Sequence, residues 1–240
     1  RVPRICMINK LDRAGANFTR AVASIKARLG VHPVPVQLPI GEEGDFAGWV
    51  DLVSEQAYFF PPAGSEEQPS VPGPIPEELL SDVASAREHL IEAAAECDEA
   101  LLERYVEGEE LTAKELIRAL RHGTLNCRIF PVFAGSALKY RGVEPVLDGV
   151  LTYLPDPMEV PPAHGLHPTS GEEFERAADS TAPTTALVFK TVADRNGDLT
   201  FLRVYSGAIR TGDQLLNPRT GKRERIGRLI RMHAAKREQI

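Results

Sequence analysis

The chain has 240 residues, of which 42% are hydrophobic and 26% charged, and its formal net charge is −6. This composition is typical of a globular protein with a substantial core, and no apolar run approaches the roughly 18 residues that a membrane span needs. The three cysteines, Cys6, Cys97 and Cys127, are far apart and show no Cys-x-x-Cys spacing. They exclude a dense disulfide framework and favour a reducing, cytoplasmic location.

Charge is distributed unevenly along the chain. Residues 61–122 carry fifteen acidic and five basic side chains, whereas residues 199–240 carry ten basic and three acidic ones. On charge alone, a solvated surface is a sufficient explanation of either segment. The opposite signs nevertheless predict that the two regions meet different partners.

The first predicted unit is a buried strand followed by a helix. The apolar run Ile5–Ile8 predicts the strand. Apolar residues at helical spacing then predict a helix that ends at Gly30; they are Phe18, Val22, Ile25 and Leu29. The chain starts with Arg1-Val2-Pro3, without Met or a signal peptide, so we expect it to begin inside a larger protein.

Short strands and a long loop are predicted next. Alternating residues 34–40 form an extended run, and Pro35 and Pro39 place it at a sheet edge because proline cannot donate a ladder hydrogen bond. Further extended runs are expected over residues 46–53, after a Gly-Glu-Glu-Gly turn, and over residues 57–60. The Pro-, Ser- and Glu-rich stretch from Pro61 to Pro76 is expected to be a loop.

Helices are predicted from residue 77 to about residue 123. Apolar positions recur beneath an acidic surface from Glu77 to Val106, and Thr112-x-x-Glu115 is a capping box that starts a shorter helix ending near Gly123. A buried strand at residues 129–133 and a helix at residues 143–154 follow. The strand–loop–helix pattern of the amino terminus therefore returns.

The last part of the chain changes to strands. A segment rich in Pro, Gly and polar residues begins at Asp156, and we expect a linker over residues 158–183. Strands are expected over residues 184–192, 199–205, 214–217 and 224–233, separated by turns at Asn196-Gly197, Ser206-Gly207, Thr211-Gly212 and Thr220-Gly221. This series predicts an antiparallel barrel, truncated because no further partner strand follows.

The stretch Asn9-Lys10-Leu11-Asp12 follows the first strand directly. Ligands of open parallel sheets bind beyond the carboxyl ends of the strands, and the Asp12 carboxylate could accept hydrogen bonds from the ring N–H and exocyclic amine of guanine together. Adenine offers no such pair of donors on that edge. The methylene stem of Lys10 could cover the base, and the Asn9 amide could bond the base or a neighbouring loop.

A second loop, Ser136-Ala137-Leu138, follows another predicted strand and could supply a backbone N–H to the exocyclic oxygen of guanine. By itself this stretch is also typical of a simple turn. The sequence contains neither G-x-x-x-x-G-K-[ST] nor a G-x-G-x-x-G after a strand, so no phosphate loop or dinucleotide fingerprint is present.

Longer stretches carry a resemblance to a known family. They are NKLDRAGANF, PVPVQLPIGEEGDFAGWVDLV, GSALKYRGVEPVLDGVLTYLPDP, and LTFLRVYSGAIRTGD through KRERIGRLIRMHAAKREQI. Through them the chain resembles elongation factor G, a translational GTPase, along essentially its whole length. By this resemblance Asn9, Lys10 and Asp12 match the guanine-specificity motif. Ser136 and Ala137 match the second base-binding loop, where Leu138 stands at a position that many other GTPases fill with Lys.

The resemblance implies an α/β fold class: the carboxyl-terminal part of a P-loop GTPase domain with an α+β insertion, followed by an antiparallel β-barrel. It assigns residues 1–30 and 122–157 to the GTPase domain, residues 31–121 to the inserted subdomain and residues 184–240 to the barrel. The insertion explains why Asp12 and Ser136 are 124 residues apart, since a strand–helix–strand crossover needs only about 30. We therefore expect guanine nucleotide binding to survive replacement of residues 31–121 by a short linker.

The resemblance also implies ligands and partners. They are GTP or GDP, small-subunit ribosomal RNA at the barrel, and the ribosomal stalk protein at the acidic insertion, for a monomeric protein that acts away from membranes. The parent would hydrolyse GTP to promote tRNA–mRNA movement or ribosome recycling, with Mg and the catalytic residues outside this chain, so these residues alone should be inactive. Asp198 stands where relatives often carry a basic residue, which puts one RNA-facing charge in doubt.

Other interpretations remain open. The basic carboxyl-terminal strands are compatible with a self-standing ribosome- or RNA-binding module in which the NKLD stretch is vestigial. A ribosomal protection protein or a class-three release factor would share many of the same features. A phosphate-loop motif upstream of Arg1 would support the GTPase, and a start codon just before Arg1 would support the module.

Overall fold

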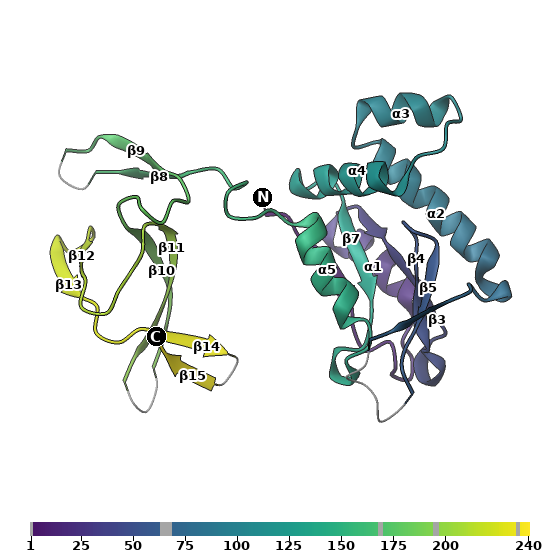
Figure 1. Cartoon of the computed structure of the whole chain (residues 1–240), viewed down its shortest axis with the longest axis horizontal. Coiled ribbons are helices and arrows are strands. Elements are labelled where there is room, and N and C mark those ends of the chain that lie inside the picture. The colour runs from purple at the N-terminus through teal and green to yellow at the C-terminus, as the bar shows by residue number, and fades with distance from the viewer. Residues whose placement is uncertain (1, 63–68, 168–169, 194–196, 234–235) are drawn as a thin grey trace. The chain divides into compact units, whose positions relative to one another are not determined.

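A three-stranded parallel sheet brings the two predicted loops to neighbouring strand ends. In the computed structural model, which describes residues 2–62, 69–167, 170–193, 197–233 and 236–240, β1 (Cys6–Ile8) pairs with β7 (Phe130–Ala134) and β7 pairs with β2 (Pro33–Pro35) (Figure 1). The register sets Ile8 opposite Ala134. The chain therefore leaves both strands at the same edge of the sheet, as the sequence predicted.

Three helices flank this sheet. Helix α1 (Phe18–Leu29) packs against β1 and β2, while α4 (Ala113–Leu125) and α5 (Val143–Tyr153) pack against β7. The predicted end of α1 is confirmed, because Gly30 adopts the left-handed conformation at its carboxyl terminus. The capping box of α4 is confirmed as well, but the helix continues to Leu125, two residues beyond the predicted end.

A four-stranded antiparallel sheet follows, in the order β3 (Gln37–Ile40), β4 (Gly48–Asp51), β5 (Gln56–Phe59) and β6 (Val71–Gly73). Both β2 and β3 are edge strands of their sheets, as the prolines predicted. Strand β6 is a correction, because it lies in the stretch expected to be a loop. Pairing with β5 gives it the long-range partner that composition alone does not reveal. Residues 63–68 of that stretch lie outside the described residues.

The acidic helical region contains a break that periodicity did not locate. A short 3-10 turn (η2, Glu77–Leu79) precedes α2 (Leu80–Ala95), and three residues separate α2 from α3 (Glu99–Val106). Asp98 starts α3 because its carboxylate accepts a hydrogen bond from Leu101 N. The chain can therefore change direction between two helices within one acidic run.

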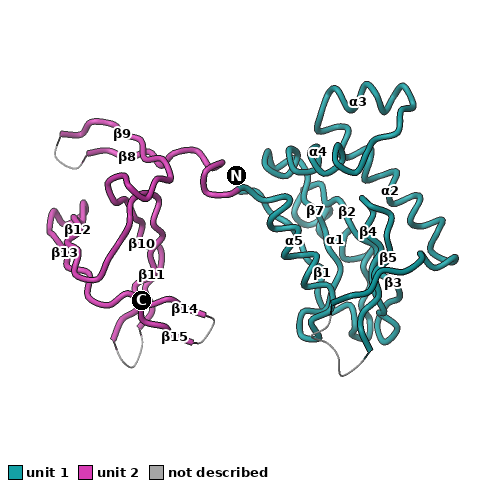
Figure 2. Tube along the Cα trace, in the orientation of Figure 1, with its two compact units in different colours: residues 1–155 teal, residues 156–240 magenta. Residues whose placement is uncertain are grey.

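Two hydrophobic clusters connect these elements. The larger cluster of buried side chains runs from Val34 through α2, α3 and α4 to Tyr153 on α5. Strand β2 belongs to the parallel sheet, and its Val34 joins the same cluster. Residues 1–155 accordingly form one compact unit, unit 1 (Figure 2).

Unit 2, residues 156–240, consists of antiparallel hairpins. Two-stranded sheets are formed by β8 (Ala163–Leu166) with β9 (Glu173–Arg176), β10 (Thr185–Val192) with β11 (Leu199–Ser206), β12 (Gln214–Asn217) with β13 (Lys222–Arg225), and β14 (Ile230–His233) with β15 (Lys236–Gln239). Antiparallel strands were predicted, but these sheets stay separate in the described part of unit 2 and do not close a barrel.

Three details of unit 2 correct the sequence-based expectations. The segment expected to be a linker contains the β8–β9 hairpin. The strand expected over residues 224–233 is split into β13 and β14, and β15 was not predicted at all. Asn196 of the expected Asn196-Gly197 turn lies outside the described residues.

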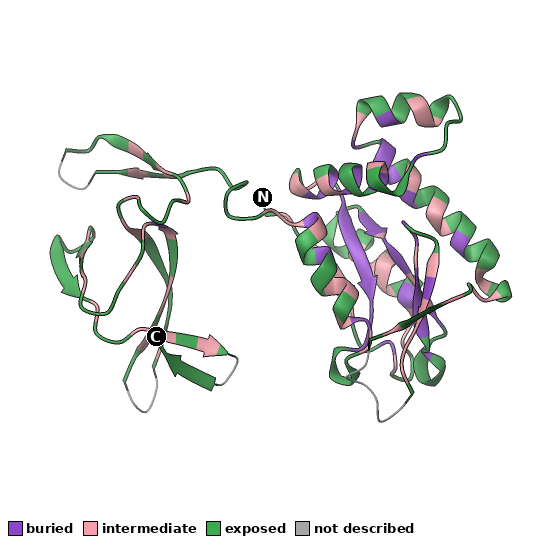
Figure 3. Ribbon diagram, in the orientation of Figure 1, coloured by how far each residue is buried: buried purple, intermediate pink, exposed green. Residues whose placement is uncertain are grey.

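Burial differs sharply between the two units. In Figure 3 buried residues gather in unit 1, whereas the described residues of unit 2 include no buried hydrophobic side chain and only Ser206 among the buried polar ones. Across the described ranges of both units, no helix is long and apolar enough to cross a membrane.

Candidate functional site

The backbones of the two predicted loops are hydrogen-bonded to each other. Gly135 N donates to Ile8 O at 3.0 Å, and Leu11 N donates to Gly135 O at 3.2 Å. A Cβ at position 135 would come within 2.4 Å of Met7 Cε and 2.7 Å of Arg141 O. Glycine is therefore needed where the loops approach, and the buried Leu11 side chain fixes the first loop on the core.

Asn9 ties the loops together. Its Oδ1 accepts hydrogen bonds from Lys10 N at 2.8 Å and from Ala137 N at 2.9 Å. The sequence left open whether this amide would hydrogen-bond the base or a neighbouring loop, and in the structure it bonds the neighbouring loop. Because Ala137 N–H is engaged by Asn9 here, it is not directed at a ligand in this conformation.

Asp12 contacts the second loop through its carboxylate, although its side chain is only 5% exposed. Ser136 Oγ donates to Asp12 Oδ1 at 2.5 Å, and Lys139 Nζ lies 3.3 Å from Asp12 Oδ2. The Ser136 hydrogen bond, aided by Lys139, lowers the pKa of Asp12 despite the opposing effect of burial. At neutral pH the group is therefore an ionised acceptor suited to N–H donors.

Lys10 and Leu138 are exposed, as are Asn9 and Ala137 of the predicted set. Lys10 has a φ of 65°, an uncommon conformation for a residue other than glycine. The hydrogen bond from its backbone N–H to Asn9 Oδ1 helps to stabilise this conformation. Leu138 follows Ala137 in a short 3-10 helix (η3, Ala137–Lys139) and is 78% exposed. A large apolar side chain so exposed beside a polar loop is available to cover an apolar ligand face.

A hollow of about 550 Å³ adjoins the first loop on the side of α1. Asn9 and Lys10 line it, but Asp12 and Ser136 do not, so it lies beside the predicted base-reading groups rather than between them. Its charged lining residues are all basic; they are Lys10, Arg13, Arg20 and Arg28.

Sequence reasoning missed two residues of this site. Lys139 directly follows the predicted loop, yet its contact with Asp12 depends on how the 3-10 turn is wound. Arg141 exchanges two backbone hydrogen bonds with Ser136, and its side chain donates to Phe46 O at 2.9 Å. Its basic character alone gave no signal of this placement.

Mg was expected to be bound outside this chain. In the part of the chain that the structure describes, no group of three or more His, Cys, Asp or Glu side chains is arranged to hold a metal ion.

Comparison with known proteins identifies the family. Residues 1–156 match the elongation factor Tu GTP binding domain, and residues 197–240 match elongation factor Tu domain 2. A solved crystal structure from Thermus thermophilus is similar to 99% of this chain, with 28% sequence identity and a TM-score of 0.74. The chain spans about a third of that protein, 32% of its length. The chain belongs to the elongation factor Tu GTP-binding domain family, and its fold is a mixed α/β GTPase-like domain followed by a β-rich second domain.

Proposed function

We propose that this chain is the guanine-reading part of an elongation factor G, a ribosomal GTPase that promotes tRNA–mRNA movement or ribosome recycling. The observation that carries the proposal is the convergence of two loops 124 residues apart, in which Ser136 Oγ bonds the Asp12 carboxylate. The family match supports the proposal, because the matched domain is described as GTP-binding.

Base recognition follows from the groups at the two loops. The ionised Asp12 carboxylate would accept hydrogen bonds from guanine N1–H and its 2-amino group, two donors that adenine does not present together. Each carboxylate oxygen has two lone pairs, so Oδ1 can keep its bond from Ser136 while it accepts from the base. The Lys10 stem and the Leu138 side chain would cover the faces of the base.

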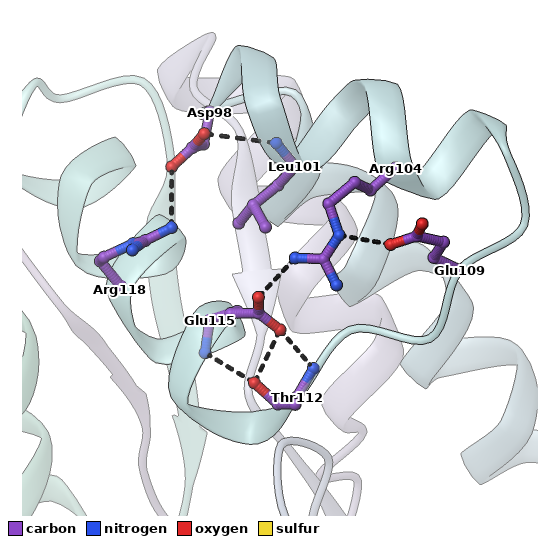
Figure 4. Close-up of polar contacts among 7 residues, drawn as sticks. All are labelled: Asp98, Leu101, Arg104, Glu109, Thr112, Glu115 and Arg118. Atoms are coloured by element: carbon purple, nitrogen blue, oxygen red, sulfur yellow. Dashed lines mark hydrogen bonds and ion pairs between the residues drawn. The ribbon is translucent and has the colours of Figure 1, made fainter.

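Charge supports separate partners for the two units. Residues 31–121 would be the inserted subdomain, and its acidic surface would meet a basic stalk protein of the ribosome. Several basic side chains there are already engaged: Arg104 lies between Glu109 and Glu115, and Arg118 lies 3.7 Å from Asp98 (Figure 4). Exposed acidic side chains therefore dominate the surface charge of α2 and α3; they are Asp82, Glu88, Glu92, Glu99 and Glu103.

Unit 2 would contact small-subunit ribosomal RNA, because its last 42 residues carry ten basic and three acidic side chains. The rest of the protein would supply the phosphate and Mg contacts needed for hydrolysis. It would act as a monomer in the cytoplasm, where ribosomes work.

The proposal is tested with the full-length protein. We expect it to bind GDP in preference to ADP and to hydrolyse GTP faster when ribosomes are added, while the 240 residues alone hydrolyse none. Ribosome binding without any preference for guanine nucleotides would contradict the proposal and support the alternative of an RNA-binding module.

A further inference from the structure

A turn between β3 and β4 touches the first base-reading loop, although the two are about thirty residues apart in sequence. Glu43 N donates to Leu11 O at 2.9 Å, and Gly15 N donates to Glu43 Oε1 at 2.7 Å. Residue 43 therefore holds the loop from both sides of Asp12, once through its backbone and once through its carboxylate.

The neighbouring carboxylate holds the start of α1. Glu42 Oε1 accepts from Phe18 N at 3.2 Å, and Glu42 Oε2 accepts from Asn17 Nδ2 at 3.2 Å. Asn17 is itself the residue that caps α1, through a 2.7 Å bond from Arg20 N. A negative charge at this helix end is stabilising, so Glu42 fixes the point at which the loop passes into α1.

The same turn also reaches the second loop. Phe46 O accepts a hydrogen bond from Arg141 Nη1 at 2.9 Å, and the Arg141 guanidinium lies 5.3 Å from the centre of the Phe60 ring. Arg141 and Ser136 exchange two backbone hydrogen bonds, of 2.9 and 3.1 Å. Phe46 is 1% exposed and belongs to the same buried cluster as Leu11.

The backbone of the turn is tightly closed. Gly41 has a φ of 74°, and a Cβ there would lie 2.0 Å from Asp45 O. Glu43 has a φ of 55°, which is uncommon for a residue other than glycine. Its contacts with both Leu11 and Gly15 hold it in that conformation.

We infer that three residues of the turn between β3 and β4 are positioning residues of the guanine pocket: Glu42 and Glu43 hold the loop of Asp12, and Phe46 holds the loop of Ser136 through Arg141. This inference rests on the proposed function and deepens it. It also argues against the expectation that nucleotide binding would survive removal of residues 31–121, because that segment contains the turn. Whatever displaces the turn would change how the base is read.

The test uses the full-length protein and a pair of nucleotides that differ at one group. Inosine diphosphate lacks the 2-amino group of GDP, so the ratio of the two affinities measures how well Asp12 is placed. In the Glu42→Ala/Glu43→Ala variant we expect GDP affinity to fall about tenfold, as for loss of hydrogen bonds to charged groups, and the GDP preference to fall toward one.

Two further variants serve as controls. Asp45→Ala removes a carboxylate of the same turn for which the structure gives no side-chain partner among the described residues, so its affinities should equal those of the wild type. Glu43→Gln keeps an acceptor for Gly15 N and should retain most of the GDP preference.

The outcomes separate the inference from the proposed function. Equal loss of affinity for both nucleotides in the double variant would show general destabilisation and overturn the inference, as would unchanged affinities. A wild-type protein without any GDP preference would overturn the proposed function and this inference together.

Discussion

Unit 1 and unit 2 use their apolar side chains in opposite ways. In unit 1 the sheets and helices bury two hydrophobic clusters, and Leu11 anchors the first predicted base-reading loop in the smaller one. In the described part of unit 2 no large apolar side chain is buried and several are exposed, among them Leu187, Phe189 and Val204 on the β10–β11 hairpin. A two-stranded hairpin has no second layer against which to bury its apolar face.

This difference determines which functional statements each unit supports. In unit 1, hydrogen bonds fix the positions of the polar side chains in the two loops, so we can propose a role in base reading for individual residues. In unit 2 the strongest functional signal is the excess of basic side chains, which act through the field that they create together. Function is thus read from geometry in unit 1 and from charge in unit 2.

The largest effect expected from this comparison concerns two phenylalanines. Phe133 on β7 is 3% exposed, and its ring lies so close to Gly149 that a Cβ there would meet it at 2.3 Å. Phe133→Ala should lower the free energy of unfolding by about 3–5 kcal/mol. Calorimetric unfolding of the 240-residue chain measures this change.

Phe189→Ala is the matched substitution in unit 2. Phe189 is 61% exposed, and truncation should cost less than about 1 kcal/mol in the same measurement. A loss of unfolding free energy as large as that of Phe133→Ala would mean that the Phe189 side chain is buried in the folded protein. The contrast in burial between the two units would then be wrong.

The second prediction concerns the basic strands of unit 2. If these residues contact ribosomal RNA, replacing Arg203, Arg223 and Arg225 by Gln in the full-length protein should flatten the dependence of ribosome affinity on salt. Every phosphate interaction that the substitutions remove lowers the logarithmic slope by about 0.7–0.9. Filter binding at several salt concentrations gives the slope.

A matched triple variant removes basic residues from unit 1, with Lys26, Arg28 and Lys114 replaced by Gln. Its salt dependence should equal that of the wild type. An equal flattening in both variants would show that the charge effect is a property of the whole molecule and not of unit 2.

A smaller effect is expected from acid titration of unit 1. The Thr112 hydroxyl and the Arg104 guanidinium, which both donate to Glu115, lower its pKa from 4.5 to about 2 (Figure 4). A carboxyl group with a lowered pKa in the folded state stabilises the fold above its unfolded pKa, and this stabilisation is lost as pH falls from about 4.5 to about 2.

The melting temperature of the wild type should therefore exceed that of Glu115→Gln at about pH 6, and the difference should shrink toward about pH 2. Glu110→Gln removes an exposed carboxylate of the preceding loop that has no side-chain partner in the described structure, and it should follow the wild type. A difference that stays constant with pH would contradict the assigned hydrogen bonds.

Local signals in the sequence predicted much of unit 1. The end of α1 at Gly30 and the start of α4 at the Thr112–Glu115 capping box were predicted, because caps act within a few residues. Strand β6 was missed because its apolar content is small and only its pairing with β5 makes it a strand. The β8–β9 hairpin was missed for the same reason, since its composition is that of a linker.

The site was predicted in part. The meeting of the loops that carry Asn9, Asp12 and Ser136 was predicted because each loop closely follows a recognisable strand. The contacts of Glu42, Glu43 and Arg141 were not, because they depend on how the second sheet is placed on the first. A Gly-Glu-Glu-Gly stretch indicates a turn, but nothing in its spacing shows which loop the carboxylates will reach.

The central claim is that Asp12 reads the base, and a change of nucleotide preference tests it most directly. Xanthine carries a carbonyl where guanine carries its 2-amino group, so an amide N–H at position 12 could donate to it. In the full-length protein, Asp12→Asn should weaken GDP binding by about 1–3 kcal/mol, the usual value of a bidentate base contact, and should favour xanthosine diphosphate.

Calorimetric titration of wild type and Asp12→Asn with both diphosphates is the decisive measurement. We predict that the wild type prefers GDP and that Asp12→Asn prefers xanthosine diphosphate. A folded Asp12→Asn variant that still preferred GDP would contradict the assignment of Asp12 as the base-reading residue.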